Sequence, residues 1–154
     1  MINIPDEIYT TIKSQLNVVP LLMVGEVHGV KNNIEFYAQL IKLFDIDTLA
    51  IELPKNFLNT PNGKYPLDGR FSKEISELIG QTNLRVIYFD TEDTVASWNQ
   101  RDDQMAKNFL AEFEPSNKTL LVAGNYHIQI TSIVNEKNET LYPMGLYLKQ
   151  KLGN

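Results

Sequence analysis

The amino-acid sequence predicts one α/β domain of three layers, with helices on both faces of a mainly parallel central sheet. Short apolar runs that suit buried strands alternate along the chain with segments of helical periodicity. Each apolar run ends at or before a glycine or an acidic residue, where a strand is expected to stop. The chain has 154 residues, 43% apolar and 21% charged, which is the size and composition of a single globular domain, residues 1–154.

Four apolar runs predict the buried strands. They are residues 21–24, 48–51, 84–89 and 119–123. Strands that are apolar throughout are typical of parallel sheets covered on both faces. Residues 128–134 and 139–142 are also predicted to be extended, with a polar turn between them.

Apolar residues spaced three and four apart predict the helices. The helical segments are residues 32–44, 71–79, 97–113 and 144–152. Gly80 is a candidate C-cap for the second of them. The third starts at Ser97, which forms a capping-box pattern with Gln100. Strands joined by helices form βαβ units, and the strands of such units run parallel.

Composition excludes several classes of function. The chain has no cysteine, so disulfides, thiolate metal sites and cysteine nucleophiles are ruled out. Its net charge is −5 and it has no basic cluster, so neither nucleic acid nor a membrane is expected as a partner. No apolar run spans a bilayer and the first residues do not resemble a signal peptide. We therefore expect a cytoplasmic protein.

Ionisable side chains follow all four predicted strands. They are Glu26 and His28, Glu52, Asp90, and His127. Carboxyl ends of parallel strands meet at one edge of a sheet, where ligands bind in open α/β folds. Acids after strands are common, but His28 and His127 are the only histidines, and each follows a strand end marked by glycine. This coincidence favours a functional site.

Arg101 lies on the apolar line of the third predicted helix, three residues after Trp98. A buried guanidinium needs an anionic partner, so Arg101 is predicted to reach an acid at the strand ends. The alternative is a stem that covers the core while its head stays in water. Asp102 and Asp103 are interpreted as acids that favour the N-terminal end of the helix dipole.

The chemistry of such a site has two forms. The sequence contains no Gly-x-Ser-x-Gly, Walker A, His-Glu-x-x-His or Gly-x-Gly-x-x-Gly pattern, so a hydrolase built here would activate water. His28, His127, Glu26 and Glu52 are able to hold a divalent ion. The same residues are equally suited to a metal-free base with its orienting carboxylates.

Four short motifs, in order, resemble the erythromycin esterase-like and ChaN/TraB/Tiki superfamily, and short ChaN-like bacterial proteins most of all. They are Gly25-Glu26-Val27-His28-Gly29, Ile51-Glu52, Arg101-Asp102-Asp103-Gln104-Met105-Ala106 and Val122-Ala123-Gly124-Asn125-Tyr126-His127. The later segment Pro143-Met144-Gly145-Leu146-Tyr147-Leu148 is also similar. The resemblance spans residues 21–152, although each motif is short.

The resemblance implies a catalytic site made of Glu26, His28, Glu52, Arg101 and His127. In the esterase branch it implies that His28 is the general base for water and is oriented by glutamate. His127 would bind the substrate or the developing oxyanion, and Arg101 would hold a carboxylate or polarise the carbonyl.

Asp90, Asn125 and Tyr126 are the further residues that we expect to contact substrate. The first hypothesis is a hydrolase that acts on a small-molecule or peptide substrate without a cofactor. The second, after the ChaN-like branch, is a protein that binds haem or another ligand without turnover. The third, after the Tiki branch, is a metal-dependent peptidase. Residues 54–70 are a candidate lid, and the chain is expected to be a minimal or trimmed member.

Overall fold

The computed structural model describes residues 4–28, 30, 32–56, 77–80, 83–91 and 95–153. Most of the candidate lid and residues 71–76 of the second predicted helix lie outside these ranges. The described elements are α1 (Asp6–Leu16), β1 (Leu21–Glu26), α2 (Asn32–Phe44), β2 (Thr48–Ile51), β3 (Arg85–Tyr88), α4 (Trp98–Glu112), β4 (Thr119–Gly124), β5 (Ile133–Val134), β6 (Thr140–Leu141) and α5 (Met144–Leu152).

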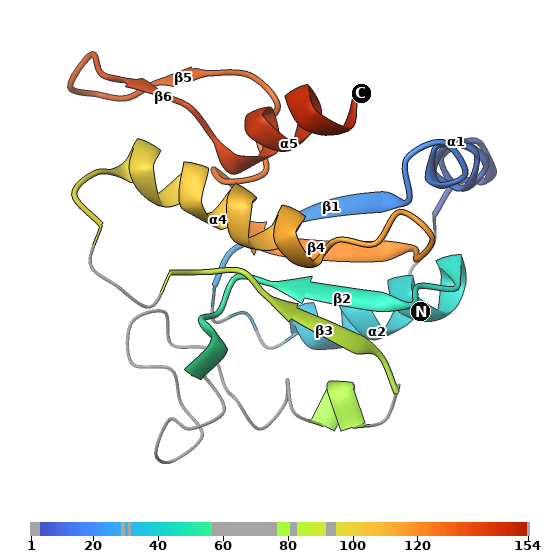
Figure 1. Cartoon of the computed structure of the whole chain (residues 1–154). Helices are drawn as coiled ribbons and strands as arrows, with labels where there is room; N and C mark the ends of the chain where they lie inside the picture. The colour runs from blue at the N-terminus through green and yellow to red at the C-terminus, as the bar shows by residue number, and fades with distance from the viewer. Residues whose placement is uncertain are drawn as a thin grey trace.

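The central sheet has four parallel strands in the order β1-β4-β2-β3 (Figure 1). This confirms the predicted parallel sheet. Strand β4 pairs on one side with β1, where Gly124 faces Glu26, and on the other with β2, where Val122 faces Ile51. The carboxyl ends of all four strands therefore meet at one edge. Strands β5 and β6 form a separate antiparallel pair.

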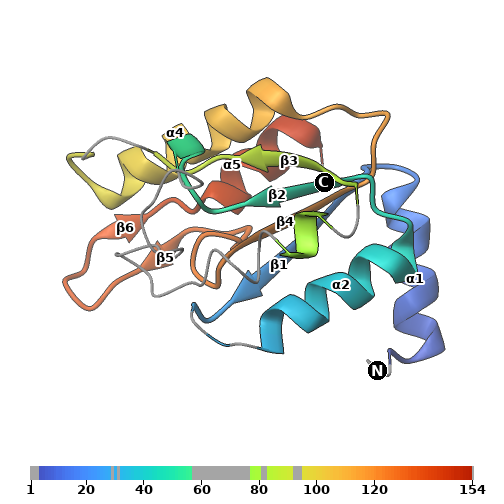
Figure 2. The same ribbon diagram turned by 90° about the horizontal axis from the view of Figure 1, so that it is seen from below.

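Helices cover both faces of the sheet, as the predicted three-layer fold requires (Figures 1 and 2). Leu49 and Leu120 pack with α1 and α2 on one face, whereas the adjacent Ala50 and Leu121 pack with α4 and α5 on the other. This alternation follows from the two-residue period of a strand. It explains why each strand is apolar throughout.

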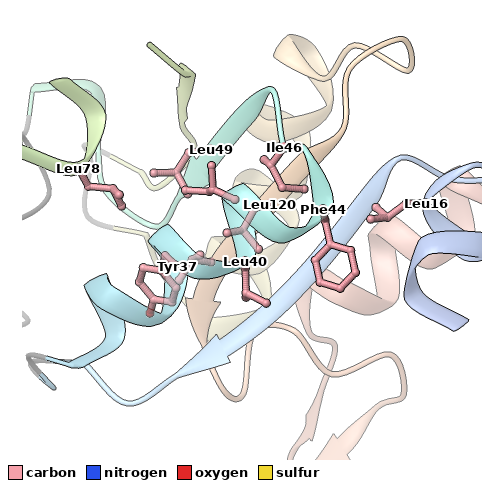
Figure 3. Close-up of a cluster of buried hydrophobic side chains, with 10 residues drawn as sticks. Leu16, Tyr37, Leu40, Phe44, Ile46, Leu49, Leu78 and Leu120 are labelled. Atoms are coloured by element: carbon pink, nitrogen blue, oxygen red, sulfur yellow. The ribbon is translucent and has the colours of Figure 1, made fainter. Parts of the chain in front are cut away.

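The first face is built around α2, whose Tyr37, Leu40 and Phe44 pack against the sheet (Figure 3). The ring of Phe44 stacks on Tyr9 of α1, with centroids 5.4 Å apart. Helix α1 is missing from the sequence-based prediction. Leu16 is its one buried residue, and Tyr9 and Ile12 are partly buried against the same apolar cluster.

The second face is closed by α4 and α5. Met105 and Phe109 of α4 and Met144 and Leu148 of α5 are almost completely buried there. Ser97 accepts a hydrogen bond from the backbone N–H of Gln100 at 3.2 Å, which confirms the predicted cap of α4. None of the helices in the described ranges is long and apolar enough to cross a membrane.

One local prediction was wrong. The extended segment predicted for residues 128–134 is reduced to β5: residue 128 belongs to a turn after β4, and only Ile133 and Val134 pair with β6. In that turn the N–H of His127 donates to the carbonyl of Gly124 at 2.9 Å. Gly80, the predicted C-cap, is the last of the described helical residues 77–80, and the residues directly after it lie outside the described ranges, so that prediction stands as it was.

Candidate active site

The carboxyl edge of the sheet brings the five predicted catalytic residues together. Glu26 ends β1 and His28 follows it, Glu52 follows β2, Arg101 lies in the first turns of α4, and His127 lies in the turn after β4. Their side chains form a continuous set of contacts that runs from Glu26 at the end of β1 to Arg101 in α4. Each of these residues is placed by the end of a strand or the start of a helix.

Glu26 and His28 form a carboxylate–imidazole pair, with Oε1 of Glu26 3.0 Å from Nδ1 of His28. The other carboxylate oxygen of Glu26 accepts hydrogen bonds from the Asn33 amide at 3.1 Å and from the Tyr37 hydroxyl. Both donors come from α2. The start of α2 therefore fixes Glu26, a role that the helical periodicity of Tyr37 alone did not reveal.

The imidazole of His28 lies between two carboxylates. Its Nε2 is 3.7 Å from Oε2 of Glu52, on the side of the ring opposite Glu26. The His28 side chain is 30% exposed, whereas those of Glu26 and Glu52 are 7% and 3% exposed. A Cβ at Gly124 would lie 3.1 Å from this Nε2, so glycine at the end of β4 allows the close approach of His28.

Glu52 is a buried carboxylate with a donor on each oxygen. Oε2 accepts the backbone N–H of Gly124 at 2.7 Å, and Oε1 accepts Nη2 of Arg101 at 2.9 Å. A buried charge is tolerated only when it is paired in this way. Glu52 thus links the ends of β2 and β4 to helix α4.

Arg101 forms the ion pairs that its place on the apolar stripe predicted. Nε and Nη2 hold Asp90 in a fork at 3.1 and 2.9 Å, Nη2 also binds Glu52, and Nη1 lies 3.2 Å from Nε2 of His127. Burial lowers the pKa of Arg101, but the hydrogen bonds and charges of Asp90 and Glu52 outweigh it, so the pKa is raised. The alternative, in which the Arg101 guanidinium stays in water without an anionic partner, was wrong.

His127 is held by Asp102, which the sequence-based interpretation assigned wrongly to the helix dipole. Nδ1 of His127 lies 2.8 and 2.9 Å from the two oxygens of Asp102, and the ring stacks on Trp98 at 5.2 Å. Burial raises the pKa of Asp102, while the hydrogen bond and charge of His127 oppose the rise.

The position of Asp102 in the sequence was a usable signal. It lies four residues after Trp98 and three before Met105, on the buried face of α4. Asp103 lies off this face and forms an exposed pair with Lys107 at 2.6 Å. The two neighbouring acids therefore have different roles.

The three predicted substrate-contacting residues lie at the same edge. Asp90 accepts hydrogen bonds from Arg101. The backbone N–H of Asn125 donates to the carbonyl of Glu26 at 3.1 Å, and Tyr126 is 68% exposed beside it in sequence. Contact between these residues and a substrate stays a prediction.

Whether the site could hold a metal ion depends on how its acids and histidines are grouped. Among the described residues, no three side chains of His, Asp or Glu are grouped so that they could hold one. Nη1 of Arg101 faces Nε2 of His127, the nitrogen that points toward Glu52. An arginine in this position competes with a cation for the lone pair of His127.

The model of the erythromycin esterase family matches residues 70–154 of the chain. This segment contains Asp90, Arg101 and His127, whereas Glu26, His28 and Glu52 precede it. No curated protein matches the sequence.

A solved structure described as "Bacterial protein toxins" is similar in fold, with a TM-score of 0.53 at 15% sequence identity. The match covers 88% of this chain and 34% of that one, so the chain spans about a third of its length. At this identity the likeness shows the fold alone.

Proposed function

Because the chain belongs to the erythromycin esterase family, we propose that it is a hydrolase in which His28 activates water for attack on an ester or amide carbonyl. The observation that carries the proposal is the position of the His28 imidazole. It is partly exposed, with Glu26 3.0 Å from Nδ1 and Glu52 3.7 Å from Nε2. A base must reach water while nearby charges stabilise its protonated form, and this arrangement meets both needs.

The proposed reaction begins with the tautomer of His28. Its Nδ1–H donates to Glu26, so the lone pair of the neutral ring is on Nε2. Nε2 removes a proton from water as the water oxygen bonds to the carbonyl carbon. The C–O or C–N bond of the substrate then breaks, and the leaving group takes that proton from His28. Glu26 and Glu52 stabilise the transient imidazolium.

We assign Arg101 to the carbonyl oxygen of the substrate. Its Nε and Nη2 donate to Asp90 and Glu52, and one hydrogen of Nη1 faces His127. The second hydrogen of Nη1 is the donor proposed for the developing oxyanion. His127, whose two ring nitrogens face Asp102 and Arg101, is proposed to support Arg101 rather than to bind substrate.

The proposed mechanism uses neither a metal nor haem. Hydrolysis should persist in the presence of a chelator, and elemental analysis of the active protein should find no stoichiometric divalent ion. A stoichiometric ion whose removal abolishes turnover would overturn the metal-free base. A haem titration followed by absorbance tests the binding alternative, and the absence of a Soret shift is expected.

The role of His28 is tested with a panel of small ester and amide substrates. We expect the variant His28→Gln to lose about 100- to 10,000-fold in kcat, the usual contribution of a general base. The thermal midpoint should change little, because the His28 side chain is 30% exposed. Asp103→Asn, which weakens an exposed pair with Lys107 outside the site, is the matched control and should remain active. Equal activity in wild type and His28→Gln would remove His28 from the mechanism.

A further inference from the structure

Asp102 lies at the centre of a buried chain of hydrogen bonds that the proposed reaction does not use directly. It is 0% exposed and accepts from two elements. Nδ1 of His127 lies 2.8 Å from Oδ1, and the backbone N–H of Met144, the first residue of α5, donates to Oδ2 at 2.7 Å. An anion so far from water needs both donors.

The contacts of His127 allow one neutral tautomer. With its proton on Nδ1, the ring donates to Asp102 and accepts from Nη1 of Arg101 at 3.2 Å. With the proton on Nε2, a lone pair would face the Asp102 carboxylate and an N–H would face the arginine donor. Both contacts would then be repulsive.

We propose that Asp102 is a positioning residue that fixes the Nδ1–H tautomer of His127 and thereby the orientation of Arg101 toward Glu52. The chain runs from Asp102 through His127 and Arg101 to Glu52, whose Oε2 lies 3.7 Å from Nε2 of His28. Helix α5 joins it through Met144. The C-terminal helix thus takes part in holding the carboxylate next to the proposed base.

The tautomer is measured without any substrate. Long-range ¹H–¹⁵N correlation spectra separate protonated from unprotonated ring nitrogens, and the chain has two histidines, so His28→Gln assigns both rings. In wild type at neutral pH we expect Nδ1 of His127 to carry the proton and Nε2 to be unprotonated. An Nε2–H tautomer in wild type would overturn the proposal, whether or not any variant folds.

The variant Asp102→Asn tests the role of the carboxylate. Its single carbonyl oxygen can accept from His127 or from Met144, and its NH₂ group must face the other donor. We expect the His127 nitrogen signals to move toward a mixture of tautomers or the Nε2–H form. The Asp103→Asn control, on the exposed side of α4, should leave these signals unchanged. Unchanged His127 signals in folded Asp102→Asn would also overturn the proposal.

The kinetic consequence rests on the proposed function. Asp102→Asn should lower kcat by about 10- to 100-fold, as loss of a supporting hydrogen bond commonly does, while KM changes little. A protein with the expected tautomer but no hydrolase activity would contradict the proposed function and leave the positioning role standing. A tautomer shift in Asp102→Asn with full kcat would contradict the link from Asp102 to Glu52.

Discussion

The two histidines differ in what surrounds them, and that difference assigns them separate roles. The His28 side chain is 30% exposed and pairs with Glu26, whereas that of His127 is 9% exposed and is enclosed by Asp102, Arg101 and Trp98. A histidine that exchanges protons with a substrate needs access to it. One that orients a neighbour needs fixed partners instead.

The buried carboxylate of Asp102 predicts a pH dependence of stability. Burial raises its pKa in the folded protein, and His127 only partly opposes the rise, so folding favours the protonated acid. Ionisation therefore costs stability. The stability advantage of wild type over Asp102→Asn should be largest below the ordinary pKa of aspartate and should fall as the pH rises through the raised value.

Urea unfolding of both proteins between about pH 3 and pH 8 measures this difference. Asp103→Asn controls for the loss of one acidic residue on α4. An advantage of wild type that grows with pH would mean that the pKa of Asp102 is lowered by its partners, not raised by burial.

Rarity and spacing in the sequence identified most of the site residues but not all of their partners. His28 and His127 stood out as the two histidines, and Arg101 as a charge on an apolar stripe. Asp102 shares that stripe, yet an acid in the first turns of a helix has a simpler explanation in the dipole. Its true partner follows β4, far along the chain, and only the folded structure brings the two together.

At the scale of elements, the turn after β4 is locked to α5 at Gly145. Its N–H donates to the carbonyl of His127 at 2.7 Å, and a Cβ on Gly145 would lie 2.5 Å from the carbonyl oxygen of Ile128. Backbone atoms cannot move aside as the tip of a side chain can. A glycine is therefore required where α5 meets this turn.

We expect Gly145→Ala to destabilise the protein by about 1–3 kcal/mol through overpacking. Gly80→Ala is the control, because a Cβ at Gly80 meets nothing within 4 Å and alanine favours a helix. In thermal melts, the midpoint of Gly145→Ala should lie below that of wild type, whereas the midpoint of Gly80→Ala should not fall. Equal midpoints would show that α5 can move away from the turn without cost.

Most elements of the fold were found from the sequence. Strands β1, β2, β3 and β4 and helices α2, α4 and α5 all correspond to predicted segments. Helix α1 was not predicted, although Tyr9, Ile12 and Leu16 lie at helical spacing and pack against the core, with Tyr9 stacked on Phe44. The predicted strand at 128–134 was too long because its partner β6 pairs with Ile133 and Val134 alone, and the sequence does not reveal the length of a partner strand.

At the scale of the whole molecule, the two larger apolar clusters share one sheet. Leu120 contributes to the cluster on one face and Leu121 to that on the other, so neither cluster can be lost without exposing the strands. The described part of the chain should therefore unfold as a single cooperative unit.

Guanidinium unfolding tests this with two probes. Trp98, the one tryptophan of the chain, reports on α4 and the site through its fluorescence, and far-UV circular dichroism reports on all helices. We expect the two transitions to coincide. An earlier transition at Trp98 would mean that the site opens separately from the sheet.

The fold class was predictable, but the strand order was not. Alternating strands and helices indicate a parallel sheet, and this was confirmed. The placement of β4 between β1 and β2 depends on which strands pair most favourably in the folded sheet. The periodicity of each strand says nothing about its partners. The meeting of strand ends at one edge followed from parallelism alone, whatever the order.

That order has a consequence for synthesis. On the ribosome β1 and β2 emerge before β4, yet in the folded sheet β1 and β2 are joined only through β4. Strand β1 therefore has no partner strand until β4 has been synthesised. Until then its unpaired backbone groups are open to pairing with a strand of another chain. His127 lies three residues after the end of β4, so the segment that pairs with β1 also brings His127 to the site.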